Sequence, residues 1–188
     1  MAHFSSPQLE YRLRLHTQRG RQVRKRVYDN VRWNFYRLLI TSRVWAQSAV
    51  DTEQDDGRET SIRNRLQDLI RDLEARDAEM QRILRTTGLE APPPGAPMVD
   101  ERIQVSSPLE NVFIRAMELL DGIVLKQQVL VSEDIEDSGQ MKEKELEWRR
   151  RFGMFAKEVR QYSRTSDENT EDETARIASD QTPDLASK

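Results

Sequence analysis

The chain has 188 residues, of which 36% are hydrophobic, 34% charged and 6% aromatic, and its mean hydropathy is −0.81. Cysteine is absent and there are two histidines, which excludes disulfides, zinc–thiolate sites, thiol catalysis and histidine-rich metal sites. No run approaches the ~18 apolar residues of a membrane span, and no apolar segment near the start predicts a signal peptide. We therefore expect a cytoplasmic protein of one domain, or of one domain with a small second module.

The first predicted elements are a flexible arm over residues 1–7, a strand over 8–16 and a basic helix over 17–28. The strand is predicted by a period of two, which is typical of a strand with one buried face. This alternation places Tyr11, Leu13 and Leu15 on one face, and Arg12, Arg14 and His16 on the other.

The next segment, residues 31–50, is apolar around nearly its whole circumference and predicts a buried helix, with Trp33, Phe35 and Trp45 in the core. A polar linker is expected over 51–60. Later come an amphipathic helix over 60–86, a Pro-rich connector at 91–97, a helix over 108–131 that Ser107 caps, and a helix over 140–163. The acidic tail, 164–188, is expected to be disordered.

The charge is unevenly distributed along the chain, although the total is only −3. Residues 1–50 hold 10 basic and 2 acidic residues, whereas 51–164 hold 18 and 24, and 165–188 hold 2 and 7. A basic segment on an otherwise acidic chain favours a site for a polyanion. The alternative is a solvated helix face, which explains many arginine runs equally well.

The early strand needs a partner, because an unpaired edge is unstable alone. The economical solution is antiparallel pairing with the same strand of a second subunit, which builds a two-stranded ribbon that fits the DNA major groove. The base-reading residues would then be Arg12, Arg14 and His16, and the dimer core would contain Tyr11, Leu13, Leu15, Phe35 and Leu38. The alternative is an ordinary sheet in which the segment around Ile103 and Val105 supplies the second strand and the arginines are simply solvated.

Other basic residues suit contacts with the phosphate backbone, which supply affinity without sequence information. The predicted phosphate contacts are Arg19, Arg21, Arg24, Lys25 and Arg26, with a free helix N-terminus near Asn30 as a further phosphate site. The run Arg149–Arg151 also stands out. For this run, ion pairing with Glu143, Glu145 and Glu147 at helical spacing is favoured over ligand binding.

Catalytic patterns are missing from the sequence: there is no Gly-rich phosphate loop, no nucleophile elbow and no metal-spaced set of His, Asp and Glu. Asp121 is the best inward-facing carboxylate, and a buried structural role is favoured for it. We expect no enzyme activity, no cofactor and no metal.

Several short motifs appear in an order that resembles the AcaB-like family of transcriptional regulators, which integrating conjugative elements and conjugative plasmids carry. They are Leu13-Arg14-Leu15-His16-Thr17, Gly20-Arg21, Ser106-Ser107-Pro108, Leu120-Asp121 and Arg149-Arg150-Arg151-Phe152. The resemblance covers residue 9 to about residue 164. It implies a ribbon-helix-helix DNA-binding dimer that activates conjugative-transfer genes.

The leading hypothesis is a mainly α protein with a short N-terminal strand, which acts as a homodimeric, DNA-binding transcriptional regulator in the cytoplasm and is nucleoid-associated when bound to DNA. Residues 8–50 would form the ribbon-helix-helix core and 61–163 a helical extension that either widens the dimer interface or contacts RNA polymerase or another regulator. The alternative is an all-helical assembly component of a conjugative element that binds no nucleic acid. RNA binding is a third hypothesis, disfavoured because the aromatic residues lie on core-like stripes.

Overall fold

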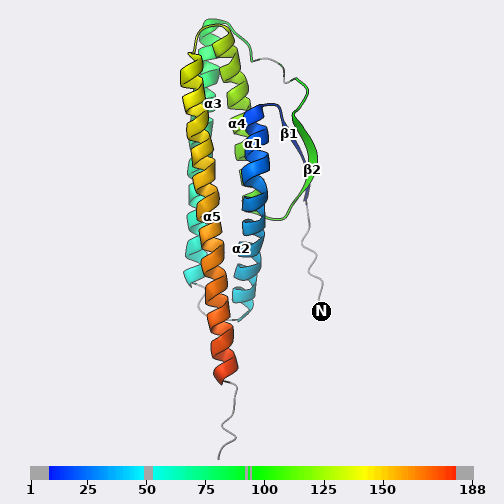
Figure 1. Cartoon of the computed structure of the whole chain (residues 1–188), viewed down its shortest axis with the longest axis vertical. Helices are drawn as coiled ribbons and strands as arrows, with labels where there is room; N and C mark the ends of the chain where they lie inside the picture. Colours follow the sequence, from blue (N-terminus) through cyan, green and yellow to red (C-terminus); the bar gives the residue numbers. More distant parts are fainter. Residues whose placement is uncertain (1–8, 49–52, 92, 94, 181–188) are drawn as a thin grey trace, which may run out of the picture.

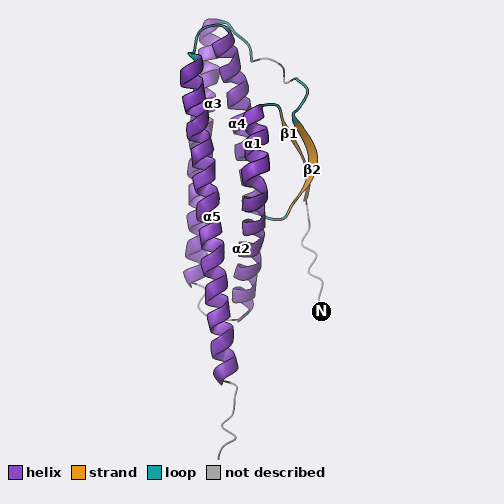
Figure 2. Cartoon of the chain, viewed as in Figure 1, coloured by secondary structure: helices purple, strands orange, loops and turns teal. Residues whose placement is uncertain are grey.

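The computed structural model describes residues 9–48, 53–91, 93 and 95–180. Long helices stand side by side, and a small two-stranded sheet covers one flank of them (Figures 1 and 2). No helix within these described ranges is both long and apolar enough to cross a membrane. The elements in chain order are β1 (Leu9–Leu15), α1 (Gln18–Val23), η1 (Arg24–Tyr28), α2 (Asp29–Ser48), α3 (Glu53–Thr87), β2 (Val99–Val105), α4 (Pro108–Ser132) and α5 (Ser138–Asp180).

The first helical column is continuous from α1 to α2, because the residues that join its parts keep right-handed helical backbone angles. Its middle part, η1, is one turn of π-helix, which holds one residue more per hydrogen-bonded turn than an α-helix. The column therefore changes helical phase at η1. Residues before and after η1 can face different neighbours.

The sheet pairs β1 with β2 of the same chain in antiparallel register, with Leu9 opposite Val105 and Leu15 opposite Val99. This pairing overturns the predicted ribbon-helix-helix dimer core, in which β1 was to pair with its copy in a second subunit. The physical reason lies in β2, which has the same alternation as β1 and turns Ile103 and Val105 inward. A partner strand from the same chain satisfies the edge of β1 without a second subunit. The ordinary-sheet alternative is the one that the structure supports.

Each strand leads into a helix through a side-chain cap. Thr17 Oγ1 accepts a hydrogen bond from Gly20 N at 3.0 Å, and Ser107 Oγ accepts one from Glu110 N at 3.1 Å. The predicted cap at Ser107 is thus confirmed. Glu110 is fully buried and also accepts from the Tyr28 hydroxyl at 2.6 Å, which ties α4 to η1.

An aromatic cluster lies where α2, α4 and α5 meet. Phe113 of α4 lies at its centre, with ring centroids 5.6 Å from Phe152, 5.7 Å from Phe155 and 6.4 Å from Phe35. Burial of such rings is the main favourable term for packing these helices. Trp33 was expected in this core, but its side chain is 60% exposed. The side chain of Trp45 lies outside the described part.

The residues predicted as a dimer core are covered inside a single chain. Leu13, Leu15, Phe35 and Leu38 are buried against the chain's own helices. Tyr11 is half-buried, and its hydroxyl donates to both carboxylate oxygens of Glu118, at 2.8 and 2.9 Å. Burial and this carboxylate raise the pKa of Tyr11 to about 12. The packing of these five residues therefore stabilises the fold of the single chain.

Two predicted irregular segments differ from the structure. Helix α3 begins at Glu53, so most of the expected polar linker at 51–60 is helical. The backbone of α5 stays helical to Asp180, well into the expected acidic tail. Each segment continues a helix whose nucleus lies elsewhere, and extending an existing helix is far less costly than starting one. The expected arm at 1–7 and the end of the tail, 181–188, lie outside the described residues.

Candidate nucleic-acid interface

The outer face of the sheet carries the residues predicted to contact bases, together with acidic partners. We call it the sheet face: Glu10, Arg12 and Arg14 of β1, and Asp100 and Arg102 of β2. Arg12 donates to Asp100 through Nε at 2.7 Å and through Nη2 at 2.8 Å. Arg14 Nε lies 3.7 Å from the same carboxylate, and Arg102 Nη1 lies 3.4 Å from Glu10 Oε1. The hydrogen bond from Arg12 lowers the pKa of the Asp100 carboxyl, so the acid is charged at neutral pH.

His16, the third predicted base contact, lies at the corner where β1 turns into α1. Its Nδ1 is 2.9 Å from the carbonyl oxygen of Gly95, and its backbone N–H donates to Asp121 Oδ2 at 2.7 Å. The connector and α4 thus hold His16.

Asp121 is buried, and all its described bonds go to this same corner. Its Oδ1 accepts from Thr17 N at 2.9 Å and from Thr17 Oγ1 at 2.6 Å. A Cβ atom at Gly20 would lie 2.4 Å from Asp121 Oδ1, so only glycine fits this close approach. These hydrogen bonds agree with the buried structural role that the sequence favoured for Asp121. Three pieces of the family-like sequence pattern, at Thr17, Gly20 and Asp121, therefore meet at one point.

Two predicted phosphate contacts are engaged in ion pairs within the fold. Arg19 Nη2 lies 2.6 Å from Glu145 Oε2, and both side chains are largely buried between α1 and α5. Arg24 binds Glu101 of β2, lies 2.8 Å from Asp29 Oδ1, and stacks over the Tyr28 ring. Breaking such part-buried pairs would leave charges without compensation. We infer that these two arginines hold elements together.

The expected helix N-terminus near Asn30 does not exist, because the helical backbone passes through η1 into α2. The carbonyl and side-chain oxygens of Asn30 both accept from Asn34 Nδ2, at 2.7 and 2.9 Å. Arg21, Lys25 and Arg26, by contrast, have no ion pair among the described residues.

A second basic surface runs along the outer side of the contact between α2 and α5, which pack side by side (Figure 1). On the first column, residues 26, 30, 33 and 37 share a face at helical spacing, and on α5 residues 149, 160 and 164 do so. We call this surface the basic seam and define it by its cations: Arg26, Arg37, Arg149, Lys157, Arg160 and Arg164.

The seam differs from its surroundings in how few acids accompany it. Residues 148–164 contain six basic residues and one acid, Glu158, which points to Arg65 of α3 at 3.9 Å. Residues 18–37 contain seven basic residues and one acid, Asp29. Among the described residues, Arg26, Arg149, Lys157, Arg160 and Arg164 form no ion pair. Two adjacent helices therefore concentrate positive potential on one side of a chain whose net charge is negative.

The ion pairs predicted between the run Arg149–Arg151 and Glu143, Glu145 and Glu147 do not form within the described part of the chain. Glu145 is bound by Arg19, and Arg151 binds Asp72 of α3 while stacking on Trp148. Arg149 and Arg150 consequently have no ion pair within the described part of the chain. The sequence does contain a signal for these arginines, unpaired among the described residues, because acidic residues become rare along α5 after Glu147.

No group of three or more His, Asp or Glu side chains within the described ranges is arranged to hold a metal ion. The basic seam is thus the feature of this part of the chain with the clearest binding chemistry.

The sequence matches no family model and no curated protein. Among solved structures, the chain is similar to AcaB from uropathogenic E. coli, crystallised in selenomethionine-containing form. The TM-score is 0.82, the sequence identity is 16%, and the alignment covers 97% of this chain and 93% of AcaB. At this identity the likeness shows the fold alone: the chain has an AcaB-like fold over nearly its whole length.

Proposed function

We propose that this protein binds double-stranded DNA through the basic seam and regulates transcription of conjugative-transfer genes, as an activator. The observation that carries the proposal is the set of seam cations that form no ion pair among the described residues: Arg26 of η1, and Arg149, Lys157, Arg160 and Arg164 of α5. The sequence motifs that resemble the AcaB-like regulators support it, and so does the AcaB-like fold. Binding to bacterial DNA would place the activity in the cytoplasm.

The dimensions of the seam suit a nucleic-acid backbone. From Arg149 to Arg164, α5 extends about 22 Å at 1.5 Å per residue. The phosphates of one DNA strand are spaced by about 3.4 Å along the duplex axis, so this length spans roughly six of them. Six cations on two parallel helices can thus contact phosphates without large changes in the protein.

Counterion release makes this proposal quantitative. Each phosphate that a cation neutralises releases condensed ions, and six contacts predict a log–log salt slope of about −5. Such contacts position the protein without reading sequence. Selectivity between DNA sites then requires further contacts, for which Arg21 and Lys25 beside the seam are candidates.

The direct test is fluorescence anisotropy with DNA from upstream of the element's transfer operons and with scrambled DNA, over a salt series. We compare the native chain with the seam variant Arg149→Gln/Arg160→Gln/Arg164→Gln. A matched control, Arg71→Gln/Arg82→Gln/Arg85→Gln, removes the same charge from α3. We expect the seam variant to lose affinity and about three units of slope, and the control to retain both. Equal losses in the two variants would contradict the proposal.

The homodimer and the contact with RNA polymerase or another regulator remain part of the proposal. Sedimentation of the protein–DNA complex measures whether one or two chains bind each site. A single chain per site at saturating protein would remove the dimer from the proposal.

The alternative function is a protein-assembly role without nucleic acid. Its support is an exposed aromatic pair beside the seam, in which Trp33 is 60% and Tyr36 43% exposed, with ring centroids 6.0 Å apart. Exposed aromatic side chains are typical of protein interfaces. Heparin chromatography distinguishes the two functions. If the seam variant and its α3 control elute at the same salt concentration, the assembly role is favoured. A shortened chain that begins at residue 52 would also lack the basic segment, but it is unsuitable for this test because it would lose Leu13, Leu15 and Phe35 from the core.

A further inference from the structure

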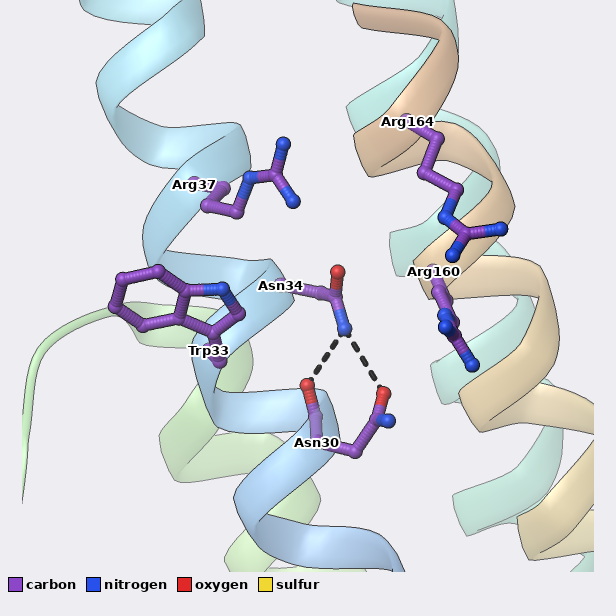
Figure 3. A pocket seen from close by; sticks show the side chains of 6 residues that line it. All are labelled: Asn30, Trp33, Asn34, Arg37, Arg160 and Arg164. Atoms are coloured by element: carbon purple, nitrogen blue, oxygen red, sulfur yellow. Dashed lines mark hydrogen bonds between the residues drawn. The ribbon is translucent and has the colours of Figure 1, made fainter. Parts of the chain in front are cut away.

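A pocket of about 280 Å3 opens between α2 and α5 within the basic seam (Figure 3). At about 30 Å3 per water this space equals roughly nine waters, which is more than a single inorganic ion needs. Its lining contains no acidic side chain. The lining residues are Asn30, Trp33, Asn34 and Arg37 of α2, and Arg160 and Arg164 of α5.

The two arginines of α5 are placed at a cost to the helix. Arg160 and Arg164 are one turn apart, where like charges repel each other. Neither has an ion pair among the described residues, although acids are plentiful elsewhere in the chain. Figure 3 shows them across the groove from Arg37, which α2 contributes. An anion bound between the two helices would relieve this repulsion.

The floor of the pocket is polar and fixed. Asn34 is only 4% exposed, and its Nδ2 is committed to the two oxygens of Asn30 at 2.7 and 2.9 Å. The two bonds set the orientation of the Asn34 amide, so its Oδ1 faces the space between the arginines (Figure 3). An oxygen there can accept from a guanidinium and hold it in place for a ligand.

The donor set favours a particular anion. A phosphomonoester carries a charge of about −1.5 to −2 at pH 7 and has three terminal acceptor oxygens, which match several guanidinium forks at once. A phosphodiester of the DNA backbone carries only one charge. At the rim, the exposed Trp33 ring offers a flat apolar surface for a ring attached to the phosphate.

We propose that this pocket binds the dianion of a small phosphomonoester, with the phosphate between Arg37, Arg160 and Arg164 and a planar group toward Trp33. Because the three arginines belong to the basic seam, the bound ligand would compete with DNA. That regulatory consequence rests on the proposed DNA binding, whereas the ligand site itself does not.

The test is isothermal titration calorimetry of the full chain with three probes that share one base. These are 5′-AMP, which has a phosphomonoester, cyclic AMP, which has a phosphodiester, and adenosine, which has no phosphate. We expect saturable 1:1 binding of 5′-AMP that strengthens as pH rises through about 6, where the monoester loses its second proton. Cyclic AMP and adenosine should bind at least about tenfold more weakly, since charge-assisted hydrogen bonds are lost.

The variant Arg160→Gln/Arg164→Gln should weaken 5′-AMP binding by about tenfold or more. Its matched control is Arg149→Gln/Arg150→Gln, which removes the same charge from the same helix outside the pocket lining and should change the affinity less than about twofold. All four side chains are exposed, and thermal melts verify that both variants fold.

Three results would overturn the ligand site: no saturable heat with 5′-AMP, equal affinity for cyclic AMP, or an equal loss in the control variant. Competition between 5′-AMP and labelled duplex DNA tests the regulatory consequence separately. If 5′-AMP binds but duplex DNA does not, the proposed function fails while the ligand site stands. If both bind without competing, the coupling is refuted.

Discussion

The sheet face and the basic seam both present arginines to solvent, but they differ in what lies opposite each charge. On the sheet face, Arg12 and Arg14 of β1 share the carboxylate of Asp100 on β2. On the seam, Arg160 and Arg164 have no acid within reach among the described residues. The first surface is a network of paired, solvated charges, whereas most cations of the second form no ion pair among the described residues.

The difference shows that the local density of arginine is a poor guide to a binding surface. The arginines of residues 12–24 are numerous, but β2 and α5 deliver Asp100, Glu101 and Glu145 to several of them. The arginines of α5 stand out less in the sequence, yet Arg149, Arg150, Arg160 and Arg164 form no ion pair with any described residue. Which cations stay available is decided by the partner elements.

The largest effect that we expect concerns the corner that anchors the sheet to the helices. Asp121→Ala leaves the part-buried His16 N–H, the buried Thr17 N–H and the Thr17 hydroxyl without their acceptor, which should lower the free energy of unfolding by about 4 kcal/mol. If the seam binds DNA, the remaining folded protein should retain its affinity at low temperature. Denaturant titration measures the first effect and anisotropy the second. Loss of DNA binding by folded protein would show that the sheet contributes to the interface.

Next in size is the contrast between two charge-matched variants. Arg149→Gln/Arg160→Gln removes two seam cations and should weaken DNA binding on the order of 50-fold at 0.1 M salt, with about two units less slope. Arg12→Gln/Arg14→Gln on the sheet face should cost less than about threefold, because Asp100 already neutralises these charges. Anisotropy over a salt series gives both numbers. The reverse order would assign DNA binding to the sheet face.

A smaller effect should follow from unmasking the sheet face. Asp100→Asn removes the shared acid, so Arg12 and Arg14 lose their partner and the face becomes more positive. We expect non-specific DNA affinity at 0.05 M salt to rise by about two- to fivefold. An unchanged affinity would mean that DNA does not approach this side of the protein. The matched control is Asp68→Asn on α3, which removes one exposed acid away from both surfaces.

The smallest effect is a titration on the sheet face itself. The hydrogen bond from Arg12, with the charges of Arg12 and Arg14, lowers the pKa of Asp100 despite partial desolvation. A carboxyl with a lowered pKa favours folding above its ordinary pKa and loses this contribution as the pH falls through the lowered value. Carboxyl NMR should show Asp100 titrating below the usual aspartate range, and Arg12→Gln should return it toward that range. An ordinary pKa in the native chain would show that the ion pair is absent in solution.

Local patterns were enough to predict part of the fold. The alternation of apolar and polar residues predicted β1 and the inward direction of Leu13 and Leu15. The capping residue Ser107 predicted the start of α4. The predicted helices over 108–131 and 140–163 lie within α4 and α5. These features depend on residues that are neighbours in sequence, where periodicity and capping act directly.

The rest depends on contacts between distant residues. The pairing of β1 with β2 joins segments about 90 positions apart, so the sequence could offer the segment around Ile103 and Val105 as a partner strand but could not choose it over a second subunit. The ion pair between Arg19 and Glu145 spans 126 positions, and its formation is what withdraws Glu145 from the arginines near it on α5. Trp33 was assigned to the core because its neighbours are apolar, although the column exposes that face. No window along the sequence contains such information.

The π-helical turn at residues 24–28 makes this architecture sensitive to the length of the chain. Removing one residue from η1 would let the turn relax to ordinary α-helix and would rotate α2 by about 100° relative to the sheet corner. Trp33 and Arg37 would then leave the groove that they share with α5, while the Thr17–Asp121 corner stayed intact. A single-codon deletion there would thus rotate one half of the helix against the other, and would turn Phe35 and Leu38 out of the core together with the binding surface.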